Sequence, residues 1–155
     1  QKNGNRWGPT FNLGRPINSA YYETQPSYSA DGKTLYFVSR KPGGVGSTDI
    51  YVSTLSDDNY WSEPVNLGTK INTPGKEESV FIHPDGKTLY FASDGHPGLG
   101  GLDLFVSYLD EHGKWGDPIN LGYPINTNKD ENSLIVGASG TMAYFASSRK
   151  GGYGG

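Results

Sequence analysis

The 155-residue sequence contains no cysteine, which excludes disulfide bonds and thiolate metal sites. It also contains no run of about 18 apolar residues, so we expect no segment of this chain to cross a membrane as a helix. The 13 Lys and Arg residues are outnumbered by 16 Asp and Glu. A net charge of −3 without a basic cluster argues against a nucleic-acid partner. Helical periodicity of useful length is missing as well, so helices are not expected.

The N-terminus lacks the marks of a targeting segment. It reads QKNGNRWG, with no initiator methionine, no apolar core and no cleavage site. We therefore expect any export signal to lie outside this chain. The absence of cysteine fits either the cytosol or the periplasm and does not choose between them.

Turn formers and aromatic residues are what the sequence has in excess. Glycine accounts for 23 residues and proline for 10, while aromatic residues make up 13% of the chain. The aromatic and β-branched content is too high for a disordered chain. This composition is typical of a repetitive β protein with many turns.

A repeat of 54 residues runs through the whole chain without insertion or deletion. The stretch DGKTLYFVS at 31–39 returns as DGKTLYFAS at 85–93. Such repetition indicates a structural unit that is used several times. We expect the repeated tryptophans to pack between units, with Trp61 and Trp115 beside Leu67 and Leu121. The residues in register include Trp7, Trp61 and Trp115; Leu13, Leu67 and Leu121; Ile17, Ile71 and Ile125; Glu23, Glu77 and Glu131; and the Tyr-Phe pairs at 36–37, 90–91 and 144–145.

Each repeat contains four short segments that are predicted to be strands. In the second copy, residues 78–83 and 88–93 flank a Pro-Asp-Gly-Lys turn, and Asp-Gly is a strong hairpin signal because glycine accepts positive φ. The second of these segments is apolar at consecutive positions, so both of its faces should be covered. A Gly/Pro loop leads to a third strand at 102–109, and Pro118 confines the brief fourth strand at 117–122 to an edge. Four antiparallel strands per repeat describe the blade of an all-β propeller.

The stretches HPDGKTLYFASDGHPGLGGLDLFVS and SADGKTLYFVSRKPGGVGSTDIYVS resemble the WD-like propeller repeats of TolB. The connector W-(S/G)-x-P-x-N-L-G-x-x-I-N-T at 61–73 and 115–127 is similar to that of propellers in large OmpA-family proteins of Bacteroidetes-type bacteria. There the propeller lies between helical repeats and a peptidoglycan-binding OmpA-like domain, and some members serve type IX secretion and gliding. The resemblance covers essentially the whole chain. It implies a periplasmic location at the outer membrane, with an envelope protein or a peptidoglycan-associated assembly as partner.

The register divides residues 1–155 into parts of one propeller. It places blades at 23–67 and 77–121, an incomplete blade at 131–155, and the outer strand of a preceding blade at 6–13. Three full repeats would exceed the chain by seven residues, which correspond to the third strand LDLFVSY. Propellers close with at least four blades. We therefore expect the ring to be completed by further chain outside this sequence or by association of copies, and we favour the former because both ends fall in or beside loops.

Carboxylates that recur with the repeat are the first candidates for a site. Glu23, Glu77 and Glu131 stand just before the innermost strand, where they could ring the channel mouth and bind a cation. They could instead be structural and accept hydrogen bonds from the backbone or a neighbouring blade. We favour the structural role, because a residue present in every blade is more often scaffold than site. Asp49 and Asp103 follow a Gly-rich loop and are expected to cap its N–H groups.

Positions that vary between copies are better candidates for partner binding, because the scaffold does not dictate them. They fall in the connector before the inner strand and at the exit of the second strand, which should reach the same face. Exposed Tyr and Arg suit contact with a protein or glycan, although ordinary solvated loops fit this pattern equally. The partner-binding candidates are Tyr21, Tyr22, Arg40, Lys41, Asp94 and Arg149.

An enzyme is the rival class, because propellers host glycosidases that need two positioned carboxylates. Most carboxylates here recur with the repeat or lie in outer turns. His83, His96 and His112 hold unrelated positions in the repeat and predict no metal cluster. The Gly-rich loops lack the order of a phosphate-binding loop. We therefore predict a non-catalytic scaffold without cofactor or metal. The alternative is the propeller portion of a carbohydrate-active enzyme or peptidase whose catalytic residues lie elsewhere.

Overall fold

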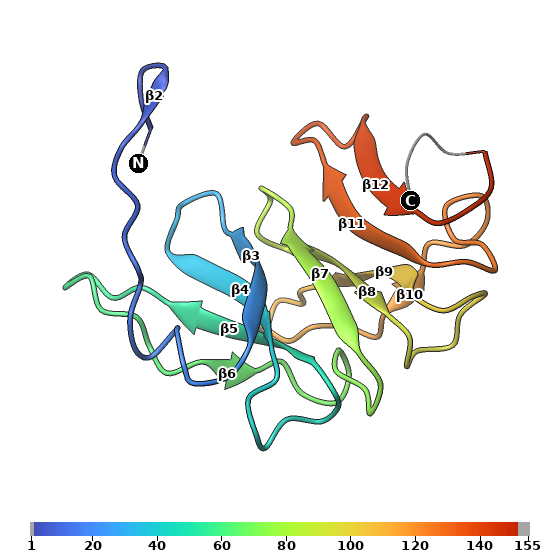
Figure 1. The fold of residues 1–155 in the computed structure, drawn as a ribbon, viewed down its shortest axis with the longest axis horizontal. Helices are drawn as coiled ribbons and strands as arrows, with labels where there is room; N and C mark the ends of the chain where they lie inside the picture. The colour runs from blue at the N-terminus through green and yellow to red at the C-terminus, as the bar shows by residue number, and fades with distance from the viewer. Residues whose placement is uncertain (1, 152–155) are drawn as a thin grey trace.

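The structure is a computed structural model that describes residues 2–151, and its regular elements are all strands (Figure 1). The described residues form four antiparallel sheets. Within the same range, no helix has the length and apolar character needed to cross a membrane. The strands in chain order are β1 (Lys2–Asn3), β2 (Arg6–Trp7), β3 (Glu23–Tyr28), β4 (Thr34–Ser39), β5 (Asp49–Thr54), β6 (Val65–Asn66), β7 (Glu77–Ile82), β8 (Thr88–Ser93), β9 (Asp103–Tyr108), β10 (Ile119–Asn120), β11 (Glu131–Val136) and β12 (Ala143–Ser147).

Two four-stranded sheets form the centre of the molecule. The first blade has the strand order β3-β4-β5-β6 and the second the order β7-β8-β9-β10, so neighbouring strands are consecutive in the chain. In the first blade, residues 35–39 of β4 are all buried, as consecutive apolar positions predict for a strand covered on both faces. The fold class is thereby confirmed as a propeller segment of four-stranded antiparallel blades.

The third blade consists of β11 and β12, which pair with each other. Its Tyr144 is 66% exposed, whereas the equivalent Tyr36 of the first blade is only 8% exposed. The difference arises because Tyr36 is covered by the second blade, while nothing in the described part of the chain covers Tyr144 in the same way. The face of the third blade that corresponds to the covered face of the first blade is therefore exposed to solvent.

The outer strand expected at 6–13 is not formed. Strand β2 ends at Trp7 and pairs with β1 in a small hairpin, and residues 8–14 form no strand. In the complete blades the outer strand pairs with the third strand, as β6 does with β5. The described residues contain no third strand of a preceding blade with which the N-terminal segment could pair. The segment instead extends away from the first blade (Figure 1).

The inner strands β3, β7 and β11 lie side by side at the centre of the fan of blades (Figure 1). Each carries a bulge at a non-glycine residue with positive φ: 52° at Gln25, 45° at Ser79 and 56° at Ser133. A backbone in this region is strained for such residues. The bulge joins neighbouring blades, because the Ser133 N–H donates to Ser79 Oγ at 3.0 Å.

We call the segment that precedes each inner strand a connector. The first, second and third connectors are residues 13–22, 67–76 and 121–130. In the second connector, Asn72 is fully buried and binds the backbone of Ile50 in the preceding blade. The Ile50 N–H donates to Asn72 Oδ1 at 2.8 Å, and Asn72 Nδ2 donates to the Ile50 carbonyl at 3.0 Å. Asn126 repeats both bonds with Leu104 at 2.8 Å. The recurring Ile-Asn pair therefore ties each connector to the blade before it.

Trp115 packs between blades, as predicted, but its neighbours differ from those expected. Its ring lies 6.2 Å from the ring of Tyr36 in the first blade, in an edge-on arrangement. Leu67 packs against the same cluster, whereas Leu121 packs at the next boundary. The expected pairing of Trp115 with Leu121 is wrong, because the Trp faces the preceding blade and the Leu faces the following one. The cluster between the first two blades comprises Tyr36, Val38, Ile50, Ile71, Val80, Ile82, Leu89, Phe91 and Phe105.

Replacement of Trp115 by alanine should destabilise the fold by about 3 kcal/mol, because a large aromatic ring is removed from the contact between two blades. The free energy of unfolding in urea is the appropriate measurement. Trp7→Ala serves as the matched control, since Trp7 is 79% exposed and should change stability by less than about 0.5 kcal/mol. Equal effects of the two changes would contradict the blade packing.

Candidate functional site

The repeated glutamates sit where a connector meets an inner strand. Glu77 begins β7 and is fully buried. Its carboxylate accepts hydrogen bonds from Thr73 N at 3.0 Å and Thr73 Oγ1 at 2.6 Å in the connector. It also accepts one from Ser93 Oγ at 2.9 Å, at the end of the paired strand β8. The side chain therefore fastens the connector to the first two strands of its blade.

The other two glutamates repeat this arrangement. Glu131 is fully buried and accepts hydrogen bonds from Thr127 N at 2.8 Å, Thr127 Oγ1 at 2.7 Å and Ser147 Oγ at 2.7 Å. Glu23 accepts the equivalent bonds from Ser19 and Ser39 and is half-buried. A cation at a channel mouth would need carboxylates that face open space. The geometry of Glu77 and Glu131 therefore favours the structural role over the channel-mouth role.

The repeated aspartates hold the Gly-rich loops. Asp49 accepts hydrogen bonds from Val45 N at 2.6 Å on Oδ2 and from Gly46 N at 3.0 Å on Oδ1. Asp103 accepts from Leu99 N and Gly100 N on Oδ2 alone, and its buried Oδ1 has no hydrogen-bond partner among the described residues. Each loop also requires a glycine beside the aspartate, Gly44 in the first blade and Gly98 in the second. At Gly44 and at Gly98, a Cβ atom would lie 1.8 Å from the aspartate Oδ2. Both aspartates therefore cap their loop, and both are buried.

Two of the variable candidates, Asp94 and Arg149, bind their own connector. Asp94 Oδ1 accepts a hydrogen bond from Lys76 N at 2.6 Å. The Arg149 guanidinium donates to the carbonyls of Pro124 at 2.9 Å and Ile125 at 2.5 Å, and its Nη2 lies 3.5 Å from Glu131. The structure thus turns both side chains toward the scaffold, which leaves them poorly placed as contacts for a partner.

The other four variable candidates meet at one end of the first blade. The Arg40 N–H donates to the Tyr22 carbonyl at 3.1 Å, so the exit of β4 lies against the first connector. The Arg40 guanidinium carbon lies 5.3 Å from the centroid of the Tyr22 ring, a cation–π arrangement. Tyr21 is 52% exposed and Tyr22 is 56% exposed. The two cations Arg40 and Lys41 and two accessible aromatic rings therefore share this end of the blade.

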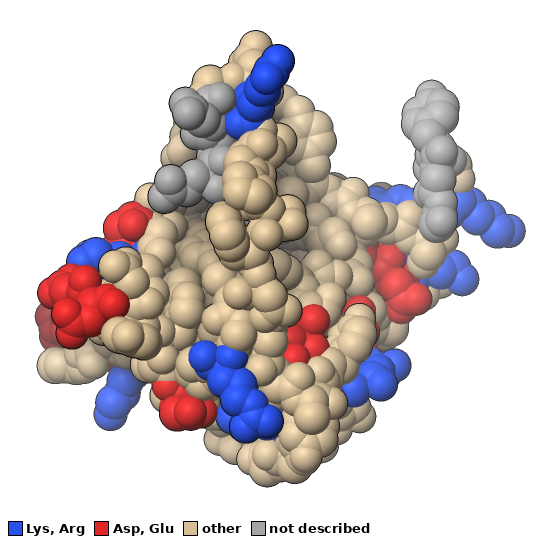
Figure 2. Space-filling view, turned by 60° about the vertical axis from the view of Figure 1, so that its left-hand side comes forward, with Lys and Arg blue, Asp and Glu red and all other residues tan. Residues whose placement is uncertain are grey.

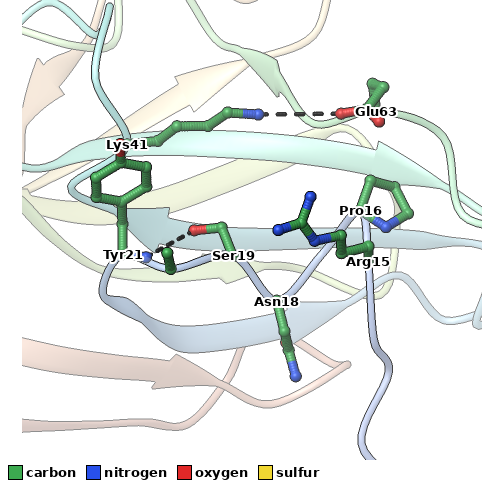
Figure 3. Close-up of a pocket in the computed structure, with 8 residues that line it drawn as sticks. Arg15, Pro16, Asn18, Ser19, Tyr21, Lys41 and Glu63 are labelled. Carbon is green, nitrogen blue, oxygen red and sulfur yellow. Dashed lines mark hydrogen bonds and ion pairs between the residues drawn. The ribbon is translucent and has the colours of Figure 1, made fainter.

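Beside these residues lies a cavity of about 330 Å³, which we call the first-blade recess. Figure 3 shows Lys41 extending toward Glu63 and Arg15 pointing into the same space, with the Tyr21 ring at one side. The Lys41 Nζ to Glu63 Oε2 distance is 4.0 Å, and both side chains are solvent-accessible. The recess contains no histidine and a single carboxylate, so its lining suits binding rather than acid–base chemistry. The lining residues are Arg15, Pro16, Asn18, Ser19, Ala20, Tyr21, Lys41 and Glu63.

The repeat shows how the lining of the recess differs from the equivalent region of the second blade. Tyr21 and Lys41 occupy the positions of Gly75 and Gly95 in the second blade. There the two backbones approach so closely that a Cβ on Gly75 would lie 2.3 Å from Asp94 Oδ1 and 3.0 Å from the Gly95 Cα. Tyr21 and Lys41 therefore change the lining without separating the two segments, because the same backbone hydrogen bond joins connector and strand exit in both blades, at 3.1 Å in the first and 3.2 Å in the second.

Sequence reasoning missed two charged residues of the recess, Arg15 and Glu63. Arg15 is replaced by Thr69 and Tyr123 in the other copies, so the comparison of copies that selected Tyr21 could have found it. Glu63 has the acidic Asp117 as its counterpart and carries no such signal. Figure 2 brings forward the left-hand side of Figure 1 and shows charges of both signs scattered over a largely uncharged surface. The positive charge at the recess is therefore local.

The described residues offer no obvious metal centre. Between residues 2 and 151, no three His, Asp or Glu side chains come close enough together to hold an ion. His83 binds a neighbouring turn, and His96 Nε2 lies 2.9 Å from the Ile71 carbonyl between the rings of Phe91 and Phe105. No residue set that could hold a cofactor was found in this part of the chain.

The blades and their connectors define the chain as part of a β-propeller, and comparison with known proteins agrees. The structure is similar to the crystal structure of TolB from Acinetobacter baumannii, with a TM-score of 0.56 and 19% sequence identity. The match covers 83% of this chain and 27% of the TolB chain. The fold is thus TolB-like, and the chain spans little more than a quarter of that protein. No family model matches the sequence, and no curated protein matches it.

Glu77→Ala should lower the free energy of unfolding by about 2–4 kcal/mol, because the buried Thr73 N–H loses its acceptor and a cavity is left. Glu77→Gln should lower the free energy of unfolding by less than about 1.5 kcal/mol. The glutamine carbonyl can accept from Thr73 N, and its amide nitrogen can donate to the Thr73 and Ser93 hydroxyl oxygens. Urea unfolding measures both changes. The exposed Glu111→Ala is the control, and a Gln variant as unstable as the Ala variant would contradict this hydrogen-bond assignment.

The pH dependence of stability should also report on Glu77. Burial raises the pKa of its carboxyl above the ordinary value, against the hydrogen bonds from Thr73 and Ser93, which favour the charged form. The folded state therefore binds the proton more tightly than the unfolded state, and this stabilisation is lost as the pH rises through the folded pKa. Relative to Glu77→Gln, the wild-type protein should lose stability between mildly acidic and neutral pH. Parallel stability curves for the two proteins would contradict the raised pKa.

Proposed function

We propose that the chain is a non-catalytic propeller scaffold that mediates protein contacts in the bacterial envelope. In this proposal it belongs to an OmpA/TolB-like protein of the periplasm that is associated with the outer membrane. The TolB-like fold supports the propeller part of the proposal. The connector motif, which resembles that of OmpA-family propellers, supports the envelope setting and an envelope protein or peptidoglycan-associated assembly as partner.

The observation that carries the proposal is the use of the repeated carboxylates. Glu77 and Glu131 bind connector and strand hydroxyls, and Asp49 and Asp103 bind loop N–H groups. Each is buried and accepts at least two hydrogen bonds from the scaffold. Hydrolysis of a glycoside needs a pair of carboxylates that face a substrate. The side chains that combine exposure with local differences from copy to copy are instead the Tyr, Arg and Lys residues beside the first-blade recess.

Exposed aromatic and arginine side chains are the residues that contribute most to protein–protein binding. Arg40 and Tyr22 support each other through their cation–π contact, which restrains both side chains before any partner arrives. Tyr21 and Lys41 extend the same surface toward the recess. We therefore assign the partner-binding surface to Tyr21, Tyr22, Arg40 and Lys41.

Charge reversal at Arg40 and Lys41, made together as Arg40→Glu and Lys41→Glu, should strongly reduce capture of a partner from solubilised cell envelopes. The melting temperature should change little, because exposed charges govern encounter more than folding. Quantitative mass spectrometry of the captured proteins is the measurement. The matched control is the pair Lys87→Glu and Lys114→Glu, which makes the same change in net charge at exposed positions away from this surface. Equal loss of capture in both pairs would contradict the assignment of the partner-binding surface.

A screen for glycan and peptide hydrolysis tests the alternative, the propeller portion of an enzyme. We expect no turnover above background for the wild-type chain. Turnover that disappears on Glu23→Gln, Glu77→Gln or Glu131→Gln, with the fold intact by circular dichroism, would falsify the scaffold proposal.

A further inference from the structure

The first-blade recess presents hydrogen-bond donors that the protein itself leaves largely unused. Among residues 2–151, the Arg15 guanidinium takes part in no hydrogen bond or ion pair, although it carries five N–H donors. The Lys41 ammonium is 4.0 Å from the Glu63 carboxylate, which is the outer limit of an ion pair. Both cations line the same cavity (Figure 3). Their donors are therefore available to a ligand.

The small polar side chains of the recess already use their donors within the protein. Ser19 Oγ donates to the Glu23 carboxylate and accepts from Tyr21 N at 3.0 Å. The Asn18 amide nitrogen donates to Asn12 Oδ1 at 2.7 Å. Glu63 is the one carboxylate in the lining. A sugar hydroxyl needs both a donor and an acceptor for good pairing, whereas an ionised carboxylate only accepts. The unused donors of the recess are thus the two cationic groups of Arg15 and Lys41, which favour a carboxylate over a neutral glycan.

The charge of the recess sets the charge of its ligand. Arg15 and Lys41 face one Glu63, so the lining has a net charge of +1 at neutral pH. One carboxylate balances this charge, whereas a dianionic phosphate would leave the occupied recess with a net charge of −1. The chain as a whole has a net charge of −3, so this local excess is not a general property of its surface.

The rim adds a preference for a peptide. Tyr21 lines the recess, and Tyr22 lies at the adjoining position in the connector. Both rings are more than half exposed and offer flat apolar surface beside the cations. Such rings pack well against the backbone and aliphatic atoms next to an acidic side chain.

We propose that the first-blade recess binds an aspartate or glutamate side chain within an acidic segment of a partner protein. Arg15 and Lys41 hold the carboxylate by charge-assisted hydrogen bonds, and Tyr21 and Tyr22 contact the flanking peptide. This inference rests on the proposed function as a protein-binding scaffold. It adds the chemistry by which the partner is recognised and includes Arg15 among the recognition residues.

Fluorescence anisotropy with a labelled peptide Gly-Asp-Glu-Asp-Glu-Gly tests the inference directly. The wild-type chain should bind this peptide and should bind the uncharged Gly-Asn-Gln-Asn-Gln-Gly at least about tenfold more weakly. The double change Arg15→Gln and Lys41→Gln should weaken binding of the acidic peptide by at least about tenfold as well. The matched control, Lys87→Gln with Lys114→Gln, should stay within about twofold of the wild type because exposed charges elsewhere attract the peptide only weakly. Thermal melts establish that all variants are folded.

Several outcomes would overturn the inference. These are no binding of the acidic peptide at about 1 mM, equal binding of the uncharged peptide, or equal loss in the recess and control variants. Binding of an oligogalacturonate without binding of the peptide would assign the recess to an acidic glycan and would also overturn it. The envelope capture experiment is independent of these results. If capture depends on Arg40 and Lys41 but the peptide does not bind, the proposed function is supported and the inference about the recess is wrong. If the peptide binds but no envelope partner is captured, the proposed function alone is contradicted.

Discussion

The hydrogen-bonded carboxylate at the start of each inner strand is the interaction on which the remaining architecture depends. Glu77 holds the second connector against the second blade, while Asn72 in that connector is hydrogen-bonded to the first blade. One short segment is thus bound on both sides, and this fixes how one sheet is placed next to another. The apolar cluster between the blades adds most of the burial, but it is nondirectional and would tolerate other angles between the sheets.

A buried carboxylate is destabilising unless it accepts hydrogen bonds, and this requirement constrains the spacing between the glutamate and its connector threonine. Thr73 supplies both its N–H and its hydroxyl group, and Ser93 supplies a third donor from the opposite strand. An insertion between Thr73 and Glu77 would move two donors away from the carboxylate. The same holds for Thr127 and Glu131, so insertions are excluded from the connectors even though connectors are loops.

The sequence was sufficient to predict the strands of the two four-stranded blades and the capping aspartates, because these depend on local pattern and on repetition, but the outer strand expected at 6–13 did not form. It was not sufficient for contacts between blades, as the wrong pairing of Trp115 with Leu121 shows. Variation between copies was also an imperfect guide to function. Asp94 and Ser148 differ chemically, yet each accepts a hydrogen bond from the connector backbone, at Lys76 and Asp130 respectively. The first-blade recess could be found only when the exchange of two glycines for Tyr21 and Lys41 was seen in three dimensions.

The bonds at the boundary between blades have a consequence for the history of such chains. Asn126 binds Leu104 as Asn72 binds Ile50, so both boundaries use this pair of bonds at the same positions of the repeat. A duplication or deletion of one whole repeat in the gene would therefore rebuild an intact boundary wherever it occurred. Changes of any other length would break a carboxylate site. Propellers of this type can thus change size in whole-blade steps, and a new blade is free to acquire its own surface, as the first blade has done with its recess.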